Sequence, residues 1–98
     1  MIKISIYKNK DNECIGFDTL GHAGAGMAGQ DIVCAAVSIL VINTINAIEN
    51  LTDTAGTVTS DEQEGMISYR LENSPAKEAL LLLDSMILGL VTMESDDN

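Results

Sequence analysis

The sequence predicts an α+β fold, a two-layer sandwich with two helices packed on a mainly antiparallel sheet, in the order ββ-α-ββ-α. Two observations support it. Four short segments have the composition of strands or the apolar–polar alternation of strands with one buried face, and short polar turns join them in pairs. A longer segment with the apolar content or spacing of a helix follows each pair, at residues 32–49 and 76–93.

The first pair of strands is predicted at residues 2–7 and 13–20, joined by the polar turn 8–12. Isoleucines alternate with polar residues in the first strand, so one of its faces is expected to be buried. The alternation in the second strand places Ile15, Phe17 and Thr19 on one side and Cys14, Gly16 and Asp18 on the other. A turn this short favours a hairpin.

The central helix is expected at residues 32–49, with Asp31 as its N-cap. From Ile32 to Ile42 every residue except Ser38 is apolar. A helix that is apolar all round must be covered on every side. One small sheet cannot do this, so we expect a second helix, a second subunit, or both.

The second hairpin is predicted from strands at about 56–60 and 66–72, the latter with Ile67, Tyr69 and Leu71 facing inward. Ser74 and Pro75 suit the N-cap and first residue of the closing helix, about 76–93. The acidic tail, about 94–98, is expected to be disordered. The 98 residues make one domain, 1–98, and a chain this small favours a homodimer.

The composition limits the classes of partner. Fifteen acidic and five basic residues give a formal charge of −10, which argues against nucleic-acid binding and suits either a basic protein partner or solubility alone. Two cysteines twenty positions apart, without a CxxC motif, predict no metal site. We find no signal peptide or membrane-spanning stretch and expect a cytoplasmic chain with free thiols.

Residues 21–38 carry the chemistry. His22 is the one histidine, and a loop with Gly21, Gly24, Gly26 and Gly29 separates it from Cys34. If Asp31 is the N-cap, Cys34 is the third helical residue, near the positive end of the helix. That end lowers a thiol pKa by about one unit or less, so a thiolate needs a cationic neighbour. His22 is the available general base, and the first helical N–H groups are candidates for an oxyanion hole.

Other interpretations of these residues stay open. A lone cysteine on an apolar helix, such as Cys34, is most often a small buried apolar side chain, and a lone histidine after a strand, such as His22, is usually an ordinary turn residue. Asp31 either caps the helix or orients His22, and Ser38 either bonds back to the carbonyl at position 34 or supports the site. Residues 24–29 also spell G-x-G-x-x-G, a dinucleotide-binding pattern, although the hairpins, short chain and acidic surface argue against it.

The pattern Gly21-His22-Ala23, followed by Gly29-x-Asp31-Ile32-Val33-Cys34-Ala35-Ala36-x-Ser38, resembles the ribosomal-processing cysteine protease family Prp. The resemblance implies a dimeric cytoplasmic cysteine endopeptidase that removes the N-terminal extension of a large-subunit ribosomal protein. It implies that Cys34 is the nucleophile and His22 the general base, and it places Asp31 and Ser38 at motif positions, as supporting residues. It implies no cofactor. At residues 24–28, GAGMA departs from the bulkier or charged residues that relatives often carry.

The resulting prediction is a Cys–His endopeptidase whose substrate is a ribosomal-protein precursor, with the glycines of residues 21–29 forming a flexible substrate loop. The alternative from another class is a non-catalytic dimeric module that binds a ribosomal or other basic protein.

Overall fold

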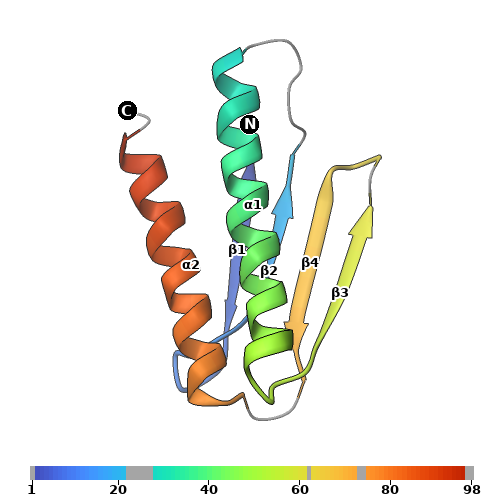
Figure 1. Ribbon diagram of the computed structural model, residues 1–98, viewed down its shortest axis with the longest axis vertical. Helices are drawn as coiled ribbons and strands as arrows, with labels where there is room; N and C mark the ends of the chain where they lie inside the picture. The colour runs from blue at the N-terminus through green and yellow to red at the C-terminus, as the bar shows by residue number, and fades with distance from the viewer. Residues whose placement is uncertain (1, 22–27, 62, 73–74, 97–98) are drawn as a thin grey trace.

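The computed structural model describes residues 2–21, 28–61, 63–72 and 75–96; for 28–34 and 94–96 it describes the backbone alone. The order is ββ-α-ββ-α, as predicted (Figure 1). The elements are β1 (Lys3–Lys8), β2 (Cys14–Leu20), α1 (Ala28–Leu51), β3 (Gly56–Asp61), β4 (Met66–Leu71) and α2 (Lys77–Asp96).

The four strands form one sheet in the order β1-β2-β4-β3, and all three pairings are antiparallel. Both helices lie on the same face of the sheet, side by side, and β3 is the edge strand farthest from α2 (Figure 1). The fold is therefore the predicted two-layer α+β sandwich.

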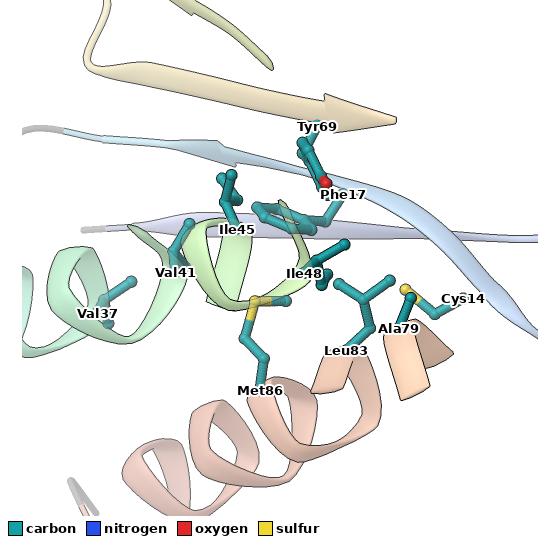
Figure 2. Close-up of a cluster of buried hydrophobic side chains, with 10 residues drawn as sticks. All are labelled: Cys14, Phe17, Val37, Val41, Ile45, Ile48, Tyr69, Ala79, Leu83 and Met86. Atoms are coloured by element: carbon teal, nitrogen blue, oxygen red, sulfur yellow. The ribbon is translucent and has the colours of Figure 1, made fainter. Parts of the chain in front are cut away.

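The core lies between the helices and the sheet. Phe17 from β2 and Tyr69 from β4 are its largest members, and their ring centroids are 5.8 Å apart. The aliphatic side chains come mainly from the helices, as Figure 2 shows. The buried apolar residues among the described side chains are Cys14, Phe17, Val37, Val41, Ile45, Ile48, Tyr69, Ala79, Leu83 and Met86.

A β-bulge in β2 changes which residues face the core. Tyr7 pairs with Gly16 but Lys8 pairs with Cys14, so Ile15 is the extra residue. Cys14 is consequently buried, with 2% of its surface exposed, while Ile15 is only half-buried. The predicted alternation, which grouped Ile15 with Phe17, is wrong at this end of the strand. A simple two-residue period cannot anticipate a bulge.

The start and end of α2 also differ from the prediction. The helix begins at Lys77, and the N–H of Ala76 donates to Oγ1 of Thr54 at 2.8 Å. Pro75 is therefore not the first helical residue. The Thr54 side chain, from the α1–β3 connection, instead accepts from the backbone N–H just before the helix. Ser74 lies outside the described residues. At the other end the helix includes residues 94–96, where the composition of the acidic tail predicts disorder.

The outward faces of the helices carry large apolar side chains. Val41, Ile45 and Ile48 of α1 are buried, but the single chain leaves the opposite side of the helix uncovered. The two helices thus do not bury each other on all sides. Among the helical side chains that the structure describes, the exposed large apolar ones are Ile39, Ile42, Leu51, Leu81, Leu88 and Val91.

The outer face of the sheet carries a polar cluster of Tyr7, Asp18, Ser68 and Arg70. The Tyr7 hydroxyl donates to Asp18 Oδ2 at 2.6 Å, and Arg70 Nη1 donates to Asp18 Oδ1 at 3.0 Å. The Arg70 guanidinium also lies 4.0 Å from the centroid of the Tyr7 ring. Hydrogen bonding to Ser68, Tyr7 and Arg70 lowers the pKa of Asp18 to about 2. The cluster ties together β1, β2 and β4.

Candidate active site

A cavity of about 280 Å³ lies between α1 and the sheet, at the end of β2 and the start of β4. Its apolar walls include Val37 and Val41 from α1 and Met66 and Ile67 from β4. Its polar lining includes Thr19, Ser38, Ser60 and Asp61. A cavity of this composition suits a peptide side chain beside a few polar groups.

Gly21 borders the cavity and fixes the end of β2. Its N–H donates to the carbonyl of Gly65 at 3.1 Å, and its φ of 145° lies in a region that L side chains rarely adopt. Gly21 thus has a backbone conformation that favours glycine at the end of β2. The next residue, His22, lies outside the described residues, as do Gly24 and Gly26.

The helix that carries Cys34 begins earlier than predicted. It starts at Ala28, so Gly29 lies in its first turn and not in the loop. Asp31 is its fourth residue, counting from Ala28, and is therefore not the N-cap. One helical glycine costs only about 1 kcal/mol, which the packing of a 24-residue helix outweighs.

This earlier start changes the electrostatics expected at Cys34, which is the seventh residue of α1 and not the third. The dipole effect of a helix end falls off within its first turn, and the helix's unpaired N–H groups belong to its first four residues. Activation of the thiol by the helix end, and an oxyanion hole made of those N–H groups, are both weakened. A cationic base becomes more important for forming a thiolate.

Ser38 and Gly21 both border the cavity. Ser38 is exposed and lies one helical turn after position 34, with Val41 a further turn along. Position 34 is therefore on the helical face that borders the cavity. Of the predicted site residues whose side chains the structure describes, Ser38 reaches the cavity directly. The cavity also touches the residue directly before His22.

Five cavity residues of the second hairpin were not predicted as site residues: Ser60, Asp61, Gly65, Met66 and Ile67. Asp61 Oδ1 accepts hydrogen bonds from the N–H groups of Gln63 and Glu64, at 3.0 and 3.2 Å, and so shapes the β3–β4 turn. These residues reach the site because β4 pairs with β2. The sequence pattern defines each hairpin, but it carries no signal for the pairing between them.

The second cysteine has a structural environment. Cys14 is buried in the core, and its thiol donates to the Gly16 carbonyl at 3.5 Å. Burial raises the pKa of this thiol, which disfavours a thiolate. Cys14 is therefore a buried apolar residue in this fold.

The geometry argues against a dinucleotide site in the glycine loop. Such a loop belongs to a parallel βαβ unit, whereas all three pairings of this sheet are antiparallel. Within the described ranges, no three His, Cys, Asp or Glu side chains are grouped as metal ligands. Neither of the two described helices has the length and apolar character needed to cross a membrane.

Comparison with known proteins decides the family. The sequence profile of the family described as cysteine protease Prp matches residues 1–98. The chain belongs to the cysteine protease Prp family. The resemblance inferred from residues 21–38 is confirmed, and with it the predicted enzyme class, a cysteine protease.

Two named relatives match this chain over nearly its whole length. The ribosomal processing cysteine protease Prp of Staphylococcus aureus is 33% identical over 98 residues, covering 100% of this chain and 92% of that protein. The Bacillus subtilis protein of the same name is 31% identical over 100 residues, covering 98% of this chain and 89% of that protein.

Solved structures agree with the sequence comparison. Prp from S. aureus in complex with a substrate peptide has a TM-score of 0.89 and 33% identity, covering 97% of this chain and 90% of that one. Prp from S. aureus with a covalently linked product peptide has a TM-score of 0.87 and 32% identity, covering 98% and 91%. The fold of this chain is therefore that of Prp.

Proposed function

We propose that this chain is a cysteine endopeptidase that removes the N-terminal extension of a large-subunit ribosomal protein, with Cys34 as nucleophile and His22 as general base. One observation carries the proposal. The cavity is bordered both by Gly21, the residue before His22, and by Ser38, one turn after Cys34. The relatives are named ribosomal processing cysteine proteases, which supports a ribosomal protein as the substrate.

The reaction follows from the chemistry of a Cys–His pair. His22 takes the proton of the Cys34 thiol, and the thiolate attacks the carbonyl carbon of the scissile peptide bond. The C–N bond breaks, the leaving amine takes the proton from the imidazolium, and a thioester remains on Cys34. Water then hydrolyses the thioester, giving up a proton to His22 and restoring the thiol.

Asp31 and Ser38 have supporting roles in this proposal. Ser38 borders the cavity through an exposed side chain, so it is suited to contact the peptide. Asp31 lies one turn before Ala35 and three residues before Cys34, in the first turn of α1. We assign it to orienting the site, because the helix start at Ala28 removes its capping role. We also assign Gly21, Gly24 and Gly26, which precede the helix, to a loop that contacts the substrate.

The partner and compartment are part of the proposal. The charge of −10 complements a cationic peptide, as expected for a segment of a ribosomal protein. Such a substrate is made in the cytoplasm, so we place the enzyme there. The exposed apolar side chains on α1 and α2 support a homodimer that covers them.

A cleavage assay tests the proposal. The native protein is incubated with a peptide spanning the cleavage junction of the organism's own ribosomal-protein precursor, and products are identified by mass spectrometry. We expect one cut with the native chain and none with Cys34→Ala. Binding of the peptide by both forms without turnover in either would instead support the non-catalytic binding module.

A further inference from the structure

The edge of the sheet at β3 is open. All of its residues from Thr57 to Asp61 are exposed, and the segment GTVTSD contains neither lysine nor proline. Within the described residues, no strand pairs with its outer side. Natural sheets usually protect such an edge with charges, prolines or bulges, because its unpaired backbone groups bind another strand.

The pairing with β4 shows which backbone groups face outward. The N–H of Glu72 donates to the carbonyl of Ala55 at 2.9 Å, which fixes the alternation along the antiparallel pair. Thr57, Thr59 and Asp61 therefore direct their N–H and C=O groups toward β4. The residues between them, Gly56, Val58 and Ser60, direct theirs toward the open edge.

The side chains along this edge lead into the cavity. Val58 pairs with Tyr69 and Ser60 pairs with Ile67, so both lie on the face of the sheet that carries the helices. The helices do not cover β3, and Val58 is 46% exposed although it lies on the core side. Ser60, two residues further, lines the cavity. The edge, the Val58 side chain and the cavity thus form one continuous surface.

We propose that β3 binds the substrate peptide as a fifth strand of the sheet, through the backbone groups of Gly56, Val58 and Ser60. The inference rests on the proposed protease function and explains how an extended chain is held across the cavity. Three observations favour a peptide over a second copy of the chain. The edge runs into the cavity, Asp61 at its end adds negative charge for a cationic segment, and related structures hold peptides.

One substitution tests the edge without disturbing the sheet. Val58→Pro removes an N–H that faces outward, and it leaves the bonds of Thr57 and Thr59 to β4 intact. Peptide affinity is measured in a Cys34→Ala background by fluorescence anisotropy, with the labelled junction peptide as probe. We expect a dissociation constant raised about five- to tenfold, the effect of one or two lost backbone hydrogen bonds. Thr59→Val, whose side chain lies on the outer face, is the control and should bind as the parent does.

Peptides methylated on one backbone nitrogen at a time give a second test, which needs no variant. Strand addition predicts that every second methyl group weakens binding to the Cys34→Ala protein, because alternate N–H groups of an added strand face its neighbour. A loss without this two-residue period would overturn the inference, as would unchanged affinity in Val58→Pro with native unfolding behaviour.

The outcomes separate the two levels of the proposal. Cleavage by the native chain together with undiminished binding by Val58→Pro would overturn the role of β3 and leave the protease function standing. A native chain that neither cleaves nor binds the junction peptide would overturn the proposed function and the role of β3 with it. If Val58→Pro halves the mass measured by light scattering and binds peptide normally, the edge pairs with a second copy, which contradicts the inference.

Discussion

The backbone N–H of Gly21 donates to the carbonyl of Gly65 at 3.1 Å, and both residues border the candidate active-site cavity. This bond fixes the chain just before His22. Because the φ of Gly21 is 145°, an alanine there is strained by about 1–3 kcal/mol. We predict that Gly21→Ala lowers kcat/KM for the junction peptide at least tenfold and also lowers the urea midpoint.

The control for Gly21→Ala is Gly89→Ala in α2. A Cβ at Gly89 would lie 2.9 Å from Cδ2 of Leu40, the end of a flexible side chain, and alanine is the better helix former. This variant should keep its activity. Equal loss of activity in the two variants would show that the effect is general destabilisation and not the backbone geometry before His22.

Tyr69 carries a buried hydroxyl for which the described residues provide no hydrogen-bond partner. An unsatisfied buried hydroxyl lowers stability, so Tyr69→Phe should raise the free energy of unfolding by about 1 kcal/mol at pH 7. Burial raises the pKa of Tyr69 to about 12, so the folded state disfavours its ionisation. The native chain should therefore lose stability between about pH 10 and 12, and the phenylalanine variant should lose less. Urea titrations of both proteins at pH 7 and between pH 10 and 12 measure these differences. A Tyr69→Phe variant less stable than the native chain at pH 7 would contradict the account.

Asp18 connects the outer face of the sheet to Arg70 and Tyr7. Its pKa in the folded state, about 2, lies below its ordinary value, so its ionised form stabilises the fold. That contribution is present above about pH 4 and is lost as the pH falls toward 2. Solvent screens a side chain that is 29% exposed, so we expect Asp18→Asn to cost about 1 kcal/mol at pH 7. A difference in unfolding free energy that persisted at pH 2 would contradict this assignment.

The exposed apolar face of the helices provides a test of the homodimer. Leu88 is 68% exposed in the single chain, so Leu88→Glu should scarcely change the stability of a monomer. In a dimer that buries this face, the new charge should halve the mass measured by light scattering at micromolar concentration. Gln63→Glu, exposed in the β3–β4 turn and outside this face, tests whether added charge alone has this effect. A native chain that is already monomeric would contradict the proposed dimer.

Much of the fold follows from local patterns in the sequence. The strand at Ile2 to Tyr7 and the inward face of Ile67, Tyr69 and Leu71 were predicted because alternation and burial agree there. Cys14 was misplaced because the bulge at Ile15 depends on pairing with β1. The cap of α2 was missed because Thr54 is more than twenty positions away from the helix it caps.

Part of the candidate site was also predictable from local features of the sequence. Cys34 and His22 stand out by their rarity and by the family pattern around them, neither of which depends on tertiary structure. The start of α1 was predicted too late, because the glycine-rich composition argued against a helix before Asp31, whereas residues 28–30 are helical. Asp61 and Ser60 reach the cavity only through the order of strands in the sheet, which the pattern within each hairpin does not encode.

The central claim is that Cys34 forms a covalent bond with the substrate. Native protein is mixed with the junction peptide, quenched in acid within one turnover, and weighed intact by mass spectrometry. We predict a transient mass increase equal to the N-terminal fragment less one water, mapped to Cys34, absent in Cys34→Ala and strongly reduced in His22→Ala. Cleavage at an undiminished rate by Cys34→Ala, or an adduct on Cys14 instead, would contradict the account.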